Sequence, residues 1–220
     1  MTLLSIEQAA STLGLNLSAA QVAALHAYLD LLVRWNGSFN LTAVRDREAM
    51  LVQHVFDCLA VIPALARHRP AGGHLLDVGS GGGLPGVVIA ICAAAWRVDC
   101  VDAVGKKAAF VRQVAAELAL PNLGSIHGRM PAAGGGLAAV DLIVSRAFAS
   151  LADFISLTRP SLKPNGVWLA MKGKVPDDEI AGLPADIDVF HVEPIVVPGL
   201  DAQRCFIWMR QKAEQAPDAR

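Results

Sequence analysis

The chain has 220 residues, of which 54% are hydrophobic, and its formal net charge is -1. This length fits one domain with an extension, or two small domains, and the composition suits a globular protein with a sizeable core. The near-neutral charge excludes a basic field over the whole surface, so a nucleic-acid partner would have to meet a local patch.

The cysteines and the apolar segments indicate the compartment. Cys58, Cys92, Cys100 and Cys205 lie far apart without C-x-x-C spacing, which favours buried thiols over a disulfide framework or a metal site. The N-terminal residues show no signal-peptide pattern, and the longest apolar stretch, residues 87–96, is too short to span a bilayer. We therefore expect a cytoplasmic protein that has no membrane segment and no metal site.

Residues 1–70 are predicted to form an all-helical extension. Ser18 and Gln21 fit a capping box, and apolar residues recur behind them at helical spacing. The expected boundaries are a first helix over 5–13, a second that begins after Ser18 and ends at Gly37, and a third that Asp46 caps.

Residues 71–212 alternate between short apolar runs and helical patterns. We expect strands at 75–78, 97–101, 124–127, 141–145 and 167–171, and helices at 84–95, 106–118, 151–158 and 177–181. Two further strands, 189–197 and 205–209, are expected to form an antiparallel pair. This alternation predicts an α/β fold with a Rossmann-like, seven-stranded, mostly parallel sheet that binds its ligand at the carboxyl ends of the strands.

Turn residues separate these elements. Pro85 suits the first turn of its helix, where a missing N–H has no cost. Residues 164–166 predict a turn, residues 134–136 a mobile glycine loop, and residues 213–220 a flexible tail.

A glycine-rich turn over residues 79–86 lets a ligand approach bare backbone at the start of a helix. The frame 81–86 matches G-x-G-x-x-G, the fingerprint of dinucleotide-binding proteins. A second frame resembles motif I of S-adenosylmethionine (SAM) methyltransferases, and its residues are Asp77, Gly79, Ser80, Gly81 and Gly83. Asp77 favours SAM, because an acid suits a sulfonium cation and repels a pyrophosphate. A glycine turn without any ligand is the third interpretation.

Asp102 ends the next predicted strand, about 20 residues after the glycines, where an acid can accept hydrogen bonds from ribose hydroxyls. This role fits NAD and SAM equally, so Asp102 does not decide between the two cofactors. The alternative is a solvated acid at the end of a strand.

Arg146 follows the predicted strand 141–145, at the edge where the ligand is expected. The Asp/Asn-Pro-Pro-aromatic signature of adenine-N6 methyltransferases and the Pro-Cys of cytosine-C5 methyltransferases are both absent here. What remains is a reaction without a base or a covalent step, such as methylation of guanine N7, which carries no proton. The fork-shaped donors of Arg146 suit a phosphate, the SAM carboxylate or guanine O6, and a surface salt bridge is the alternative.

Further polar residues surround this predicted edge. His54 and Asp57 lie three apart on one helix face, either as core and capping groups or, with Arg45, as part of a substrate rim. Lys172 and Lys174 bracket a glycine after the strand 167–171, as phosphate contacts or as solubilising lysines.

The combination of these segments resembles the ribosomal RNA small subunit methyltransferase G family, also called the glucose-inhibited division protein B family. The resemblance covers about residues 31–209 and rests on Trp35-Asn36, Asn40-Leu41-Thr42-Ala43, His54-Val55-Phe56-Asp57, the glycine turn with its Gly-Leu-Pro-Gly ending, Lys106-Lys107, Ser145-Arg146-Ala147 and Lys172-Gly173. It implies a class I SAM-dependent methyltransferase fold that methylates N7 of a guanine in the decoding-region loop of 16S rRNA.

The resemblance also implies individual contacts. Gly79, Leu84, Arg146 and the pair Met130-Pro131 should contact SAM. Members of the family usually have an acid in that pair, and Pro131 supplies neither an acid nor an N–H, which puts the details of adenine binding in question.

We therefore expect a monomeric 16S rRNA (guanine-N7)-methyltransferase that uses SAM, with naked rRNA or the small ribosomal subunit as its partner. Residues 1–70 would lie on the RNA side, residues 71–212 would form the SAM-binding core, and Arg146 and Asp57 are the candidate catalytic residues. The alternatives are an NAD-dependent dehydrogenase and a SAM- or RNA-binding protein without turnover.

Overall fold

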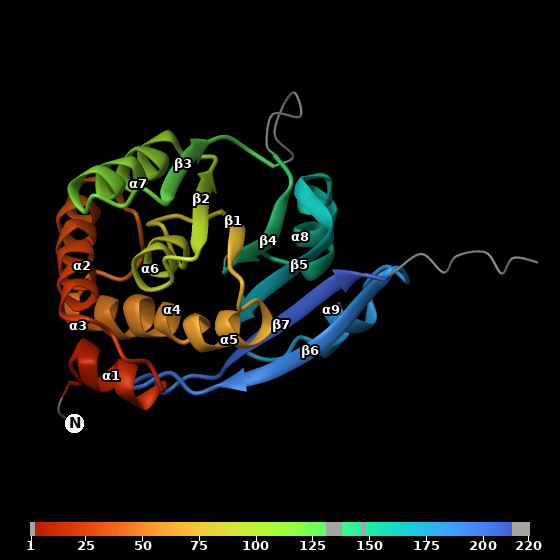
Figure 1. Cartoon of the computed structure of the whole chain (residues 1–220), viewed down its shortest axis with the longest axis horizontal. Coiled ribbons are helices and arrows are strands. Elements are labelled where there is room, and N and C mark those ends of the chain that lie inside the picture. The colour runs from red at the N-terminus through yellow and green to blue at the C-terminus, as the bar shows by residue number, and fades with distance from the viewer. Residues whose placement is uncertain (1–2, 131–137, 147, 213–220) are drawn as a thin grey trace, which may run out of the picture.

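The computed structural model describes residues 3–130, 138–146 and 148–212. A seven-stranded sheet lies at the centre of the protein (Figure 1). Its strands, in spatial order, are β3 (Leu123–His127), β2 (Trp96–Asp102), β1 (Gly73–Val78), β4 (Val140–Ser145), β5 (Leu162–Lys172), β7 (Arg204–Gln211) and β6 (Ile187–Ile195). The first five strands in this spatial order, from β3 through β1 to β5, pair in parallel. Strand β7 runs antiparallel to both of its neighbours, β5 and β6. The predicted fold class is confirmed.

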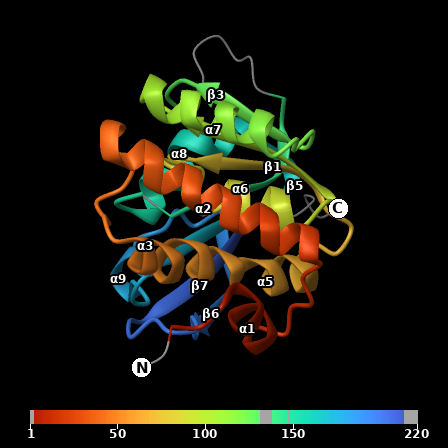
Figure 2. The same cartoon turned by 90° about the vertical axis from the view of Figure 1, so that its left-hand side faces the viewer.

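Helices cover both faces of the sheet. One face carries α2 (Ala19–Phe39), α6 (Gly86–Cys92), α7 (Gly105–Glu117) and the helical run from α3 (Arg47–Met50) through a π-helical turn (Leu51–Phe56) and α4 (Asp57–Leu59) to α5 (Val61–His68). Figure 2 shows α2 and this run lying across that face. The other face carries α8 (Leu151–Thr158), which continues into a 3-10 turn (Arg159–Ser161), and α9 (Asp177–Ala181).

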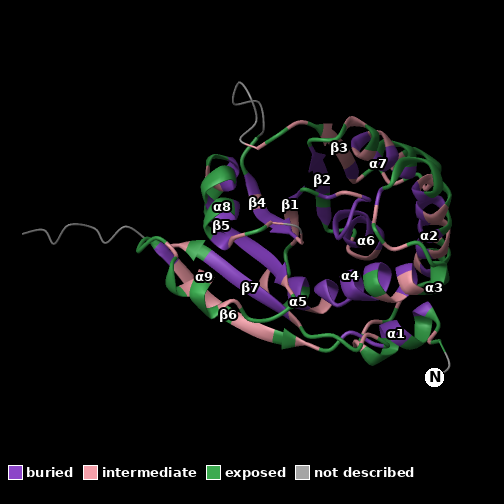
Figure 3. Cartoon of the chain, turned by 180° about the vertical axis from the view of Figure 1, so that it is seen from behind, coloured by how far each residue is buried: buried purple, intermediate pink, exposed green. Residues whose placement is uncertain are grey.

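The alternation of side chains along each strand divides the core into two clusters. Leu142 and Val144 of β4 join the cluster under the N-terminal helices, while Ile143 between them joins the cluster under α8. Both faces of the central strands are therefore apolar, and the core in Figure 3 is buried throughout the middle of the sheet. The N-terminal helices share one hydrophobic cluster with the sheet, so they are packed onto it.

The helix caps were predictable from local residues. Ser5 caps α1 (Ile6–Thr12) and Ser18 caps α2, each with a complete capping box, and the Asp46 carboxylate accepts from the N–H of Ala49. The predicted end of α2 at Gly37 is wrong. The helix runs on to Phe39 and stops at Asn40, which adopts the left-handed conformation with φ 50°.

Several other boundaries differ from the predictions, among them the end of the predicted helix 84–95, which is Cys92, and the predicted strand 189–197, which is Ile187–Ile195. Pro85 precedes α6, which begins at Gly86, so the proline is the N-cap residue and not part of the first turn. The predicted turn at residues 164–166 lies inside β5, because the register with β4 jumps from Leu162 to Val167 and leaves an irregular stretch between them. The glycine loop at 134–136, Pro131 and the tail at 213–220 lie outside the described residues.

The helical run Arg47–His68 is long and apolar enough by composition to cross a membrane. Of its apolar window, 72% is buried inside the protein, as in a core helix that packs against a sheet. This run was not singled out from the sequence, because the short apolar stretches within it are separated by polar residues that the structure now places at the candidate site.

Candidate active site

A hollow of about 320 Å³ lies over the carboxyl ends of β1 and β2. Ligands of open α/β sheets bind at this edge. Three of the predicted cofactor residues, Gly79, Asp102 and Met130, line the hollow, and Phe148 and Leu157 close its other side. Phe148 and Leu157 were missed by the sequence reasoning, because their position depends on the packing of α8. Arg129, which also lines the hollow, was missed as well, although it comes directly before Met130, just after the end of β3.

Asp102 connects this hollow to the glycine turn. One carboxylate oxygen accepts from the N–H of Gly81 at 2.9 Å, and the other accepts from the N–H of Val104 at 2.8 Å. A carboxylate has about four lone-pair sites, so Asp102 can accept further hydrogen bonds from hydroxyls in the hollow. Because its charge is already held by two backbone N–H groups, the side chain is fixed in place before a ligand arrives.

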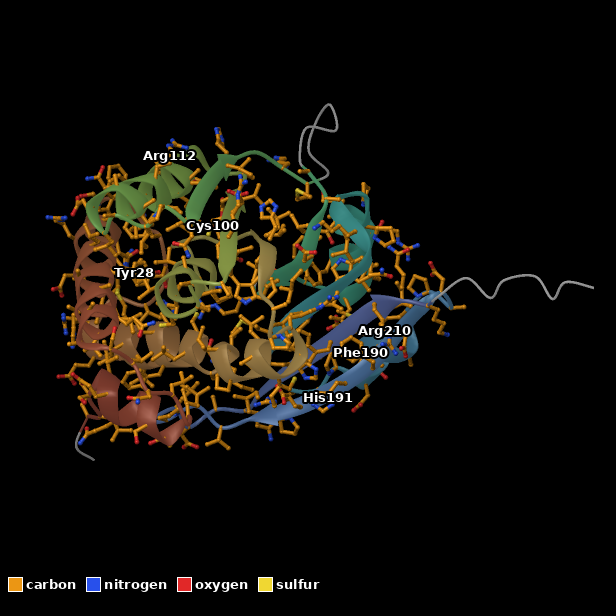
Figure 4. The ribbon with its side chains drawn as sticks, in the orientation of Figure 1. Tyr28, Cys100, Arg112, Phe190, His191 and Arg210 are labelled. Atoms are coloured by element: carbon orange, nitrogen blue, oxygen red, sulfur yellow. The ribbon has the colours of Figure 1, made fainter. Side chains whose placement is uncertain are left out.

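The glycine turn is shaped by three positive φ angles, at Gly79 (70°), Gly81 (58°) and Gly83 (80°). A Cβ at Gly83 would lie 2.4 Å from Cγ2 of Val87, so the turn needs glycine there for space as well as for conformation. Tyr28 of α2, labelled in Figure 4, donates its hydroxyl to the carbonyl of Gly82 at 2.6 Å. This buried bond ties the turn to the N-terminal helices.

Three other residues of the predicted cofactor motif are buried in this turn. Ser80 and Leu84 are each 4% exposed, and Leu84 belongs to the hydrophobic core. Asp77 is fully buried below the turn and accepts from the N–H of Gly86 at 2.8 Å through Oδ2, while Oδ1 has no partner among the described residues. Burial raises the pKa of Asp77 to about 7. Asp77 therefore anchors the start of α6 to β1, and a direct contact with SAM stays a prediction.

A second hollow, of about 270 Å³, is lined by Gln53, His54, Asp57, Arg146, Met171, Lys172, Gly173 and Arg204. It gathers residues from the π-helical turn, β4, β5 and β7. The two hollows are neighbours, since Nζ of Lys172 in the second donates to the carbonyl of Phe148, which lines the first, at 3.3 Å. The carboxyl ends of β4 and β5 thus continue the edge that β1 and β2 begin.

Asp57 is the centre of the second hollow. The residue is buried, and its carboxylate accepts from Nη1 of Arg146 at 3.1 Å and from Nε of Arg204 at 2.8 Å. Arg204 was missed by the sequence reasoning. The sequence prediction paired the strand 205–209 with 189–197 and not with 167–171, so it gave no reason to place Arg204 beside Lys172. In the structure the register of β5 and β7 pairs Lys172 with Cys205, which brings Arg204 to this edge.

Arg146 makes three contacts with the helical run, two with the π-helical turn and one with the first residue of α4. It donates to the carbonyl of Gln53 at 3.1 Å, to Asp57, and through Nη2 to Nδ1 of His54 at 3.4 Å. The side chain is 26% exposed and its partner Asp57 only 3%, so this is a part-buried network and not an exposed surface pair. Arg146 faces the second hollow, and its predicted contact with SAM remains a prediction.

His54 and Asp57 do lie on one face of the helix, as their spacing predicted. Because arginine has only donors, the Nδ1 of His54 must accept, and the neutral ring then carries its proton on Nε2, which lies 2.7 Å from Oγ1 of Thr42. Burial, followed by the charge of Arg146, lowers the pKa of His54 to about 4. His54 is therefore neutral at physiological pH.

The segment around Thr42 is held by Asn36. The side chain of Asn36 accepts from the N–H of Thr42 at 2.9 Å and donates to the carbonyl of Val44 at 2.8 Å. The Trp-Asn and Asn-Leu-Thr segments of the sequence thus form one platform beside His54. Arg45 donates to the carbonyl of Asn36 at 3.0 Å and lies at the exposed edge of this platform.

The two predicted phosphate lysines differ. Nζ of Lys172 lies 3.0 Å from a carboxylate oxygen of Glu179, so its charge is already paired. Lys174 is exposed beside it. Of the two, Lys174 is the one whose charge is open to a partner in solution.

The model of the rRNA small subunit methyltransferase G family matches residues 21–207 of this chain. Ribosomal RNA small subunit methyltransferase G of Acidovorax sp. (strain JS42) is 53% identical over 219 residues, which cover 95% of each chain. The protein of the same name from Leptothrix cholodnii is 56% identical over 207 residues and 93% of each chain. This chain belongs to the rRNA small subunit methyltransferase G family.

The fold agrees with that family membership. The structure of a TehB-like SAM-dependent methyltransferase from Corynebacterium glutamicum superposes with a TM-score of 0.54, at 17% identity, over 86% of this chain and 99% of the other. At this identity the likeness concerns the fold alone, which is that of class I SAM-dependent methyltransferases. The resemblance drawn from the sequence is confirmed at the level of the family and of the fold.

Replacing Asp57 by asparagine should destabilise the protein strongly. The substitution leaves two arginines facing each other without their shared anion, and breaking a buried pair in this way costs about 3–5 kcal/mol. The matched control is Asp30→Asn, which removes an exposed partner of Arg47 and should cost less than about 1 kcal/mol. Urea unfolding of both variants measures the difference, and equal losses would contradict a central role for Asp57.

His54 should make the protein acid-sensitive. In the unfolded chain His54 binds its proton near pH 6.5 and in the folded protein only near pH 4, so stability falls as the pH drops through this window. At about 1.4 kcal/mol per pKa unit, the wild type should lose up to about 3 kcal/mol more than His54→Gln between these pH values. The opposing effect of Asp77 is present in both proteins and cancels. Parallel stability curves from urea unfolding at each pH would show that His54 does not titrate in this way.

Proposed function

We propose that this protein transfers the methyl group of SAM to N7 of a guanine in 16S rRNA. The observation that carries the proposal is the pair of adjoining hollows at one sheet edge. The first is built from backbone and one fixed carboxylate, and the second from cations around a buried anion. The family membership supplies the rRNA substrate, and guanine N7 is the acceptor that needs least from the side chains found here.

The residues of the first hollow fit SAM. Asp102 has free lone pairs for ribose hydroxyls, the positive φ of Gly79 exposes bare backbone, and the side chain of Met130 and the ring of Phe148 offer apolar contact to a base. SAM, when bound, supplies an electrophilic methyl group on a positively charged sulfur. An NAD-dependent dehydrogenase is not favoured, since the family is one of methyltransferases.

The second hollow supplies position and charge. Guanine N7 carries no proton, so transfer needs alignment and no general base. This agrees with His54, which donates to Thr42, accepts from Arg146 and so has no free ring nitrogen to remove a proton. The arginine fork of Arg146 is held by Asp57 and would orient either the guanine or the carboxylate of SAM.

The RNA side of the protein is proposed to include residues 1–70 together with Arg45, Lys172 and Lys174. Arg45 and Lys174 are exposed, and Lys174 directly follows Gly173 of the second hollow, whereas Lys172 lines this hollow and is paired with Glu179. With a net charge of -1 the protein would meet rRNA through this local patch, as a monomer in the cytoplasm.

The direct test is transfer of a labelled methyl group to 16S rRNA, both naked and in the small subunit, followed by mapping of N7-methylguanosine. Transfer to one guanine of either substrate supports the proposal. SAM binding without transfer to either substrate would leave a binding protein without turnover. Stabilisation against heat by NAD and not by SAM would favour the dehydrogenase.

Asp102→Ala should weaken SAM binding by about tenfold to a hundredfold, because the loss of a charged acceptor for hydroxyls costs about 1.5–3 kcal/mol. Isothermal titration calorimetry measures the affinity, and melting without ligand shows how far the glycine turn is loosened. The matched control is Asp188→Ala, whose carboxylate pairs with Arg210 on β7 at 2.7 Å. Equal SAM affinity in wild type and Asp102→Ala would remove Asp102 from the site.

Arg146→Lys should lower the rate of methyl transfer by on the order of a hundredfold, because misplacement by about an ångström costs this much where alignment is the catalysis. A lysine keeps the charge but cannot reach Gln53, His54 and Asp57 at once, as the guanidinium does. Single-turnover methylation of rRNA gives the rate, circular dichroism and melting confirm the fold, and Arg47→Lys is the matched control. Equal rates would show that Arg146 contributes charge only.

A further inference from the structure

We propose that His68, His191 and Glu193 form a binding site for a divalent transition-metal ion of the Zn²⁺ type. His68 ends α5, and the other two residues lie on β6, where Figure 4 labels His191 beside Phe190. One ligand atom from each residue lies within 4.8 Å of the others. None of the three lines either of the two hollows of the candidate active site, so this proposal is independent of methyl transfer.

The distance between the two residues on β6, His191 and Glu193, suits tetrahedral coordination of a metal ion. With bonds of 2.0–2.2 Å, ligand atoms in such a site lie about 3.3 Å apart. Nε2 of His191 and Oε2 of Glu193 are already 3.4 Å apart. His191 and Glu193 are two apart on β6 and pair without a break in register with Trp208 and Phe206 of β7, so both side chains lie on the same face of the sheet.

His68 completes the set from the helix side. Its ring lies 4.4 Å from that of Trp208 and 5.2 Å from that of His191, measured between centroids, so the aromatic packing fixes its orientation. The Nε2 of His68 is buried and has no hydrogen-bond partner among the described residues.

Arg67 is the competitor of the ion. Its Nη2 lies 2.7 Å from Oε2 and 3.0 Å from Oε1 of Glu193, and its side chain is 55% exposed. In the metal-free protein this guanidinium balances the carboxylate. Because more than half of its side chain is exposed, the guanidinium of Arg67 can swing into solvent when an ion takes its place.

The donor set decides the class of ion. Two imidazole nitrogens and one carboxylate suit Zn²⁺ and neighbouring transition metals, whereas Mg²⁺ and Ca²⁺ prefer oxygen alone. Three protein ligands leave a fourth position for water. His68 also lines an open hollow of about 820 Å³, which gives the ion a route from solvent. A bound ion would clamp the end of α5 to the edge strand β6.

The test uses the full-length protein after treatment with a chelator, titrated with Zn²⁺ by calorimetry and with Co²⁺ by visible absorption. We expect one Zn²⁺ per chain, a Co²⁺ spectrum of four-coordinate type, and a higher melting temperature with Zn²⁺. His191→Gln and His68→Gln should abolish all three. Because His191 is 43% exposed, His191→Gln keeps the fold even where His68→Gln disturbs the packing on Trp208.

Two controls separate this site from adventitious binding. His26→Gln and Cys92→Ser, which change another histidine and the least buried cysteine, should bind Zn²⁺ like the wild type. Arg67→Ala should bind it several-fold more tightly, because the competing cation is gone. The proposal is overturned by a wild type that binds no stoichiometric Zn²⁺, by His191→Gln that still binds it, or by Arg67→Ala that binds it no more tightly.

Discussion

The buried carboxylate of Asp57 is the interaction on which the candidate site depends. It joins three segments that are distant in sequence, namely the N-terminal helical run, the end of β4 through Arg146 and the start of β7 through Arg204. A single anion between two guanidinium groups leaves the second hollow with an excess of positive charge. Since Lys172 is balanced by Glu179, this excess amounts to about one unit, enough to favour a phosphate or carboxylate without the repulsion of three free cations.

The glycine turn and this charge network are two parts of one edge. Tyr28 holds the turn from the helical side by its bond to Gly82, and Asp102 holds it from the sheet side by its bond to Gly81. The N-terminal helices therefore do more than cover the sheet, because they also hold the backbone of the glycine turn. The helices also share one hydrophobic cluster with the sheet, which packs them firmly against it.

Most of the fold could be predicted from local sequence patterns. Capping boxes, the alternation of apolar runs and the glycine turn each depend on residues a few positions apart, and the structure confirms the elements that they predicted. The predictions that were wrong also rested on local patterns. Gly37 lies within a helix because Asn40 takes the left-handed position, and residues 164–166 extend β5 because the register with β4 can shift there.

The site was harder to foresee, because its contacts cross the chain. Arg204 reaches Asp57 over 147 positions, and no short pattern announces such a pair. For Asp77, whose contact with SAM stays a prediction, the sequence did not show that the carboxylate is buried below the turn, where it accepts from the N–H of Gly86. Spacing can place an acid at the end of a strand, but only packing decides whether it faces the ligand or the helix behind it.

The neutral state of His54 links this packing to the chemistry. An imidazole between a guanidinium and a threonine hydroxyl cannot gain a proton without meeting the charge of Arg146, and it cannot lose one to the substrate while Nδ1 accepts and Nε2 faces Thr42. In this arrangement His54 is poorly suited to acid–base catalysis, but it helps to fix the orientation of the Arg146 guanidinium. Methylation at guanine N7 would need a fixed arginine and no acid–base catalyst, because the N7 lone pair is free and only its direction toward the methyl group has to be fixed.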